Sequence, residues 1–88
     1  MEKLSNLPNI GKTLANKLVK SGITNSEELK QLGSENTLLK IATIENSGVC
    51  INMLFALEGA IQGIRWHGIS LDRKQELKEF FKLMQKKL

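Results

Sequence analysis

Residues 7–12, with the sequence LPNIGK, decide how the fold begins. Apolar residues at helical spacing flank this stretch, namely Leu4 before it and Leu14, Ala15, Leu18 and Val19 after it. Pro8 disfavours the continuation of a short helix around residues 2–5, and Gly11 opens a second helix that reaches about residue 20. The stretch is therefore predicted to be a tight turn between two helices.

The start of the second helix is predicted to hold an anion. The first N–H groups of a helix have no intrahelical partner, and the helix dipole makes that end partly positive. Gly11 lets another backbone approach because it has no side chain, and Lys12 adds a full charge. A nucleic-acid phosphate is the anion that suits such a turn. The candidate nucleic-acid-binding residues are Asn9, Ile10, Gly11, Lys12, Thr13, Lys17 and Lys20.

Each candidate has an expected role. The backbone amides of Ile10, Gly11 and Lys12 hold one phosphate, and the Thr13 hydroxyl adds a donor. Ile10 also anchors the turn in the core. Contacts of this kind position a protein on nucleic acid without reading its sequence. Two lysines further along the helix are expected to contact neighbouring phosphates: Lys17 and Lys20.

The turn also has alternative interpretations. Such a turn can serve only to pack two helices, with Gly11 chosen for close contact. Asn9 tolerates a positive φ better than most residues, so the turn can form. The Asn9 side chain would then either obstruct the approach of a phosphate or donate its own amide hydrogen bond.

The remaining pattern is helical, and no run alternates as a strand would. Helices are expected at about 25–33, 34–44, 49–63 and 70–88, with a turn at 46–48 and an irregular link at 64–69. Asn25, with Glu28 as its capping-box partner, and also Ser34 and Ser70 are the expected N-caps. The 49–63 segment is apolar almost all round, which is typical of a central helix. The sequence thus predicts one all-α domain over residues 1–88, a compact five- or six-helix fold.

Two parts of the chain resemble known families. Residues 4–19 resemble the helix-hairpin-helix motif of DNA-binding proteins, with Asn9 in place of the motif's first glycine. The run 54–61, LFALEGAI, with Trp66 and the segments 21–23, 27–29 and 32–33, resembles the C-terminal domain of the TfoX/Sxy competence regulators. This second resemblance covers nearly the whole chain. It implies a small all-helical domain linked to the control of DNA-uptake genes.

Charge is unevenly distributed, although the net charge is only +4. Residues 1–26 and 65–88 are basic, whereas residues 27–64 hold more glutamates than lysines. Glu58, inside the apolar segment, is expected to pair with Arg65 or a nearby lysine. A row of lysines on the last helix is interpreted as a solvated face, with a second phosphate-facing patch as the alternative: Lys74, Lys78, Lys82 and Lys86.

Other classes of function are excluded by what the sequence lacks. A lone His67 and a lone Cys50 supply no metal site, and Cys50 is expected to be a buried thiol. There is no glycine-rich phosphate loop, no nucleophile with a base and no matched carboxylate pair, so neither a cofactor nor an enzyme activity is expected. No segment is apolar for long enough to span a membrane, and a cytoplasmic protein is expected.

The sequence therefore predicts a non-enzymatic DNA-binding domain in transcription or competence regulation. It would contact the phosphate backbone weakly and with a steep dependence on salt. The alternative is a protein–protein interaction module or a homodimer in which the turn is only structural. The acidic middle of the chain, Met53, Met84 and the small residues of the 49–63 segment would then meet the partner.

Overall fold

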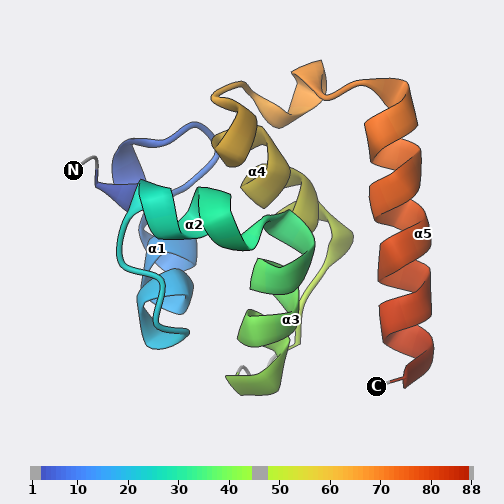
Figure 1. Ribbon diagram of the computed structural model, residues 1–88, viewed down its shortest axis with the longest axis horizontal. Coiled ribbons are helices and arrows are strands. Elements are labelled where there is room, and N and C mark those ends of the chain that lie inside the picture. The colour runs from blue at the N-terminus through green and yellow to red at the C-terminus, as the bar shows by residue number, and fades with distance from the viewer. Residues whose placement is uncertain (1–2, 45–47, 88) are drawn as a thin grey trace.

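A computed structural model of the chain describes residues 3–44 and 48–87, and all regular structure in these ranges is helical (Figure 1). The α-helices are α1 (Lys12–Lys20), α2 (Ser26–Leu32), α3 (Ser34–Ile44), α4 (Ile51–Gln62) and α5 (Leu71–Lys87). Short 3₁₀ turns, η1 (Leu4–Asn6) and η2 (Trp66–Gly68), precede α1 and α5. The predicted all-α class is confirmed. Within these ranges, no helix combines the length and apolar character needed to cross a membrane.

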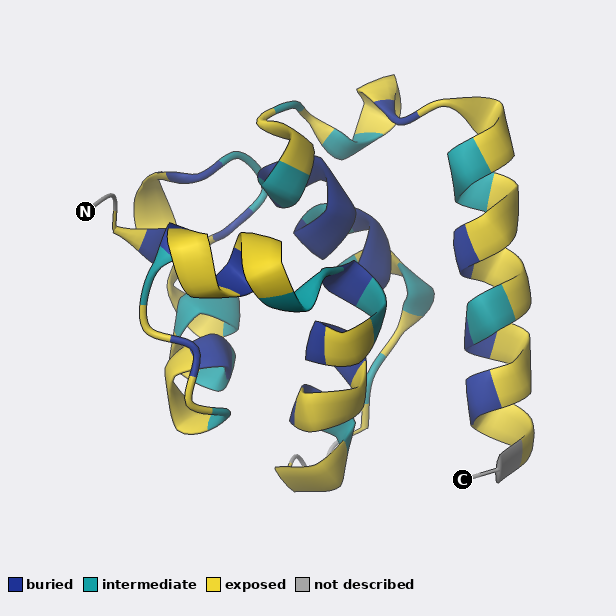
Figure 2. Ribbon diagram, viewed as in Figure 1, coloured by how far each residue is buried: buried dark blue, intermediate teal, exposed yellow. Residues whose placement is uncertain are grey.

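Helix α4 is the centre of the fold, as its apolar sequence predicts. Leu54, Leu57 and Ala60 are fully buried, and α4 contacts α2, α3, α5 and η2. In Figure 2 the middle of α4 is coloured as buried, whereas α2 and α5 each expose one side. The helix ends at Gly63, whose φ of 75° is the left-handed conformation that glycine adopts at little cost.

Two of the three predicted N-caps form as expected. The amide three residues after Asn25 donates to its side-chain oxygen at 2.9 Å, and the amide three residues after Ser70 donates to its hydroxyl at 3.1 Å. The prediction for Ser34 is wrong. Ser34 is the first residue of α3, and its hydroxyl donates to Glu58 Oε1 at 2.7 Å. A buried carboxylate of another helix therefore engages the hydroxyl that was expected to cap α3.

The N-terminal segment departs from the predicted pattern. Within the described residues, the expected first helix is only the 3₁₀ turn η1, which leads into the N-terminal turn (residues 7–11). On α1, Leu18 is fully buried and Leu14 and Ala15 are half-buried, but Val19 is 53% exposed. Val19 follows Lys12 by seven residues, nearly two helical turns, so both lie on the solvent-facing side of α1.

Helix α5 packs on the other helices through one side (Figure 1). Leu77, Phe81 and Met84 are buried and Phe80 is half-buried, so these residues form the apolar side of α5. Leu88 lies outside the described residues. The turn expected at residues 46–48 also falls largely outside them.

Candidate nucleic-acid interface

Asn9 ties the N-terminal turn to a distant part of the chain. Its φ of 69° is the left-handed conformation that asparagine tolerates. Its Nδ2 donates to the Ile64 carbonyl at 2.9 Å, and its Oδ1 accepts from the Trp66 amide at 3.1 Å. The N-terminal turn therefore rests against the C-terminal end of α4, where the link to α5 begins (Figure 1).

Gly59 makes room for this contact. A Cβ added to Gly59 would overlap the Asn9 amide nitrogen and would lie 2.8 Å from the Ile64 carbonyl oxygen. The small residues of α4 predict the close approach of a crossing helix, but at Gly59 the N-terminal turn takes that place. Both polar atoms of the Asn9 side-chain amide, Nδ2 and Oδ1, have partners inside the protein, so this side chain acts as a structural clamp.

The start of α1 leaves several backbone amides open. The Ile10 amide donates to the Leu7 carbonyl at 3.3 Å and the residue is 4% exposed, so Ile10 anchors the turn and its amide is already engaged. The Ala15 amide makes the bond to the Gly11 carbonyl that begins the helix. No acceptor within the described ranges takes the amides of residues 11–14, and Gly11 supplies no capping side chain. Of the three backbone amides that were expected to hold a phosphate, those of Gly11 and Lys12 are open and that of Ile10 is already bonded within the turn.

The start of α4 lies beside the start of α1. A hollow of about 360 Å³ is bounded by residues from both helix ends, namely Gly11, Lys12, Thr13, Leu14, Lys17, Cys50, Asn52 and Met53. Neither helix has a side-chain hydrogen bond from its N-cap residue or an acidic residue in its first turn. Two partly positive helix ends therefore border the same hollow.

The structure gathers only part of the expected lysine set at this hollow. Lys12 and Lys17 both line it. Lys20 is the last residue of α1, and eight residues of helix place it about 12 Å further along the axis. Lys20 can therefore extend a basic surface along α1, but it does not share the open amides.

Cys50 and Asn52 are residues of this hollow that sequence reasoning missed. The expectation of a buried thiol is wrong, because Cys50 is the extended N-cap residue of α4 and is exposed. The sequence carries only a weak signal for the position of Cys50. Cys50 is the N-cap residue of α4, just as Asn25 is the N-cap residue of α2. Only the packing of α4 against the N-terminal segment brings these residues to the start of α1.

Carboxylates are missing from the segments that form this surface. Residues 3–26, 48–57 and 59–71 contain no Asp or Glu. The described carboxylates belong instead to α2, α3 and α5 and to Glu58 of α4. Because nearby carboxylates would oppose the field of the helix ends, their absence from these segments favours a positive potential at the hollow.

Glu58 pairs with Arg73, which contradicts the expectation of Arg65 or a lysine. Arg73 Nη2 lies 3.0 Å from Glu58 Oε1 and 2.7 Å from Glu35 Oε1, and Nη1 lies 3.1 Å from Glu76 Oε1. We call these four residues the Arg73 cluster. The expected structural ion pair is present, but its partner comes from α5 because that helix packs across α3 and α4 at this level.

Further hydrogen bonds hold Glu58 in its charged form. Burial raises the pKa of Glu58, but hydrogen bonds from Arg73, Gln62 and Ser34 together outweigh it and keep the pKa below its ordinary value. The Gln62 and Ser34 donors lie 2.6 and 2.7 Å from the carboxylate. In turn, the hydrogen bonds that Arg73 donates to Glu35 and Glu58 raise the pKa of Arg73. The cluster therefore fastens α5 to α3 and α4.

The link between α4 and α5 carries stacked rings. The Trp66 ring centroid lies 6.0 Å from that of Phe55 and 3.9 Å from that of His67, and Lys74 Nζ lies 5.5 Å from the Trp66 centroid. Trp66 thus packs on Phe55 of α4. Among the residues that the structure describes, no three His, Cys, Asp or Glu side chains are grouped to hold a metal ion.

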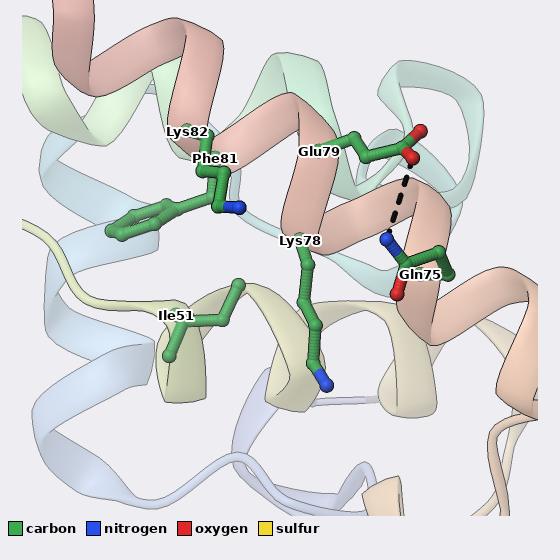
Figure 3. Close-up of a pocket in the computed structure, with 6 residues that line it drawn as sticks. All are labelled: Ile51, Gln75, Lys78, Glu79, Phe81 and Lys82. Carbon is green, nitrogen blue, oxygen red and sulfur yellow. Dashed lines mark hydrogen bonds between the residues drawn. The ribbon is translucent and has the colours of Figure 1, made fainter.

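The lysine row of α5 does not have uniform surroundings. Lys74 lies over Trp66, whereas Lys78 and Lys82 line a second hollow of about 280 Å³ between α4 and α5 (Figure 3). Gln75, which donates to Glu79 at 3.3 Å, also lines this hollow together with Glu79. The glutamate beside the lysines dilutes their charge, which agrees with a solvated helix face.

The chain has relatives among known proteins. Residues 1–81 match the TfoX C-terminal domain family. Protein Sxy of Escherichia coli (strain K12) is 38% identical over 79 residues, which cover 90% of this chain and only 37% of Sxy. The crystal structure of an uncharacterized protein from Listeria monocytogenes, in a triclinic form, has a TM-score of 0.91 at 49% identity and covers 96% of this chain and 94% of that one. A protein of unknown function from Listeria monocytogenes, in a tetragonal form, has a TM-score of 0.85 at 52% identity over 90% of this chain and 96% of that one.

Proposed function

Because this chain belongs to the TfoX C-terminal domain family, we propose that it serves competence regulation in the cytoplasm by binding the DNA backbone at the start of α1. One observation carries the proposal: the open amides of residues 11–14 lie on a surface whose segments contain no carboxylate. In this proposal η1, the N-terminal turn and α1 together act as a helix-hairpin-helix DNA-binding element.

The chemistry of the proposed contact follows from the donors at this helix end. The amides of Gly11, Lys12 and Thr13 donate to one phosphate, the Lys12 ammonium neutralises it, and the Thr13 hydroxyl adds a donor. Lys17 lines the same hollow and adds positive charge beside it. These groups meet phosphate oxygens and reach no base edge, so they give no sequence preference. Binding is therefore weak and falls steeply with salt.

Charge reversal at the helix start tests the proposal. Gly11 has a φ of −93°, and no atom lies within 4 Å of an added Cβ, so Gly11→Glu is compatible with the fold. We expect Gly11→Glu and Lys12→Glu each to weaken the binding of a fluorescent DNA duplex at low salt about tenfold or more, because each sets a carboxylate beside the phosphate. Fluorescence anisotropy titrations measure this loss.

Lys86→Glu is the matched control. It reverses the same charge at an exposed position near the end of α5, so we expect a much smaller loss. The proposal is wrong if the unaltered chain shows no affinity for duplex DNA at low salt. It is also wrong if Gly11→Glu and Lys12→Glu bind as well as the unaltered chain.

A protein partner or a second copy of the chain is the alternative. It is favoured by exposed apolar side chains on three helices, namely Val19, Leu39, Ile44, Leu71 and Leu83. In that case the N-terminal turn is only structural. Light scattering that finds a dimer, together with no loss of dimer in Lys12→Glu, would favour this alternative.

A further inference from the structure

We propose that the DNA contact continues from the N-terminal turn onto the link between α4 and α5, where Arg65 binds an adjacent phosphate. This inference rests on the proposed function and adds a residue that sequence reasoning assigned to pairing with Glu58. It begins with the Asn9 clamp. Ile64 and Trp66, the two chain neighbours of Arg65, both hydrogen-bond to the Asn9 side chain, so Arg65 lies directly beside the N-terminal turn.

The backbone around Arg65 is held in place. On one side, the Ile64 amide donates to the Gly59 carbonyl at 2.9 Å. On the other side, the Gly68 amide donates to the Arg65 carbonyl at 2.9 Å, which closes η2. The position from which the side chain extends is thus fixed relative to the turn, so little backbone order has to be gained when a ligand binds.

The guanidinium of Arg65 is not used by the fold. Arg65 is exposed, and its side chain makes no hydrogen bond or ion pair with the residues in ranges 3–44 and 48–87. Arg73, by contrast, is paired with Glu35, Glu58 and Glu76. An unpaired guanidinium on an ordered surface suits a phosphate, because its planar fork of donors can meet two phosphate oxygens at once.

The surroundings of Arg65 add positive charge. No Asp or Glu lies between residues 59 and 71, and the first acidic residue after Arg65 is Asp72 at the start of α5. Lys74 is bound on the link, where its Nζ donates to the His67 carbonyl at 3.4 Å. Lys12 of α1, Arg65 of the link and Lys74 of α5 therefore supply cationic groups from three separate segments.

Duplex DNA matches this arrangement. Each strand carries one negative charge per about 3.4 Å of helix axis, so a backbone lying on the turn presents further phosphates to neighbouring groups. A phosphate held by the amides at the start of α1 leaves an adjacent one for Arg65, because Asn9 fixes the two segments side by side.

Neutralising Arg65 tests this extension. We expect Arg65→Gln to weaken duplex binding roughly threefold to tenfold at low salt and to reduce the slope of log K against log salt by about 0.9, the value for one phosphate contact. Lys86→Gln removes the same charge and should leave that slope unchanged. Thermal unfolding of Arg65→Gln should match the unaltered chain, because the guanidinium has no partner in the described structure.

The outcomes separate this inference from the proposed function. If the unaltered chain does not bind the duplex, both fail. If Lys12→Gln loses affinity while Arg65→Gln keeps the affinity and salt slope of the unaltered chain, only the extension onto the link is overturned. An equal loss for Arg65→Gln and Lys86→Gln also overturns it, since the effect would then come from net charge alone.

Discussion

Glu58 and Gly59 are consecutive residues of α4, and they contact two different regions. In one region the charged groups are paired with one another, and in the other region they are not. Glu58 belongs to the Arg73 cluster, where charged groups are paired across three helices. Gly59 supports the N-terminal turn, beside which the amides of residues 11–14 and the Arg65 side chain have no partner in the described part of the chain. Consecutive helical residues point about 100° apart, so one helical turn can serve both regions.

Because of this difference, substitutions in the two regions should affect the stability of the fold to different extents. A buried charge that loses its partner destabilises a protein strongly, whereas an exposed charge without a partner contributes little to folding. The Arg73 cluster therefore fastens the helices together, whereas beside the N-terminal turn the amides of residues 11–14 and the Arg65 guanidinium have no partner among the described residues. Substitutions in the two regions should show this separation directly.

Arg73→Met should have the largest effect on stability. Removing the guanidinium leaves Glu58, whose side chain is 10% exposed, without its cation. We expect the free energy of unfolding to fall by about 2–3 kcal/mol, less than for a fully buried pair because Arg73 is partly exposed and two other donors to Glu58 remain. Denaturant unfolding measures this loss, and Arg65→Met is the matched control with little expected change. Equal losses in the two variants would remove the distinction between the regions.

Gly59→Ala should destabilise the contact with the N-terminal turn. The added Cβ would meet the Asn9 side chain and the Ile64 carbonyl, and such overpacking costs about 1–3 kcal/mol. Gly68→Ala is the control, because there the added Cβ lies 3.5 Å from Ile64 Cδ1, an ordinary contact. Thermal unfolding compares the two variants.

Asn9→Gly sharpens this second test. Glycine accepts the positive φ of Asn9 and removes the side chain that the Cβ added by Gly59→Ala would strike. The loss of stability in the double variant should therefore be smaller than the sum of the two single losses. Strict additivity would mean that the Asn9 clamp does not press on α4 at this position.

The pH dependence of stability should show the smallest of these effects. The pKa of Glu58 is lower in the folded chain than its ordinary value of 4.5. Its contribution is therefore fully present above that ordinary value and is lost as the pH falls through the folded pKa. The pKa of Glu28 is also lowered, chiefly by hydrogen bonds from Thr24, and this adds a contribution of the same sign.

Glu58→Gln separates the two carboxylates. Unfolding measured between neutral and acidic pH should depend less on pH in this variant, and the remaining slope belongs in part to Glu28. A slope identical to that of the unaltered chain would show that the Arg73 cluster does not bind the charged form of Glu58 preferentially.

The sequence by itself determined the features that depend on residues close in the chain. The cap at Asn25, the cap at Ser70 and the apolar character of α4 all involve neighbours within a few residues, so propensity and spacing are enough to predict them. The open start of α1 at Gly11 was predictable for the same reason. The match of residues 54–61 to a known family also needed no coordinates.

Only the tertiary structure decided which distant groups meet. Asn9 finds its partners at Ile64 and Trp66, and Glu58 takes Arg73 instead of Arg65. Cys50 is exposed beside α1 because it precedes α4 rather than lying on its buried face. Such pairings depend on the angle and register at which helices cross. The crossing angle and the register are set by the packing of many side chains at once. The periodicity of one segment therefore does not predict them.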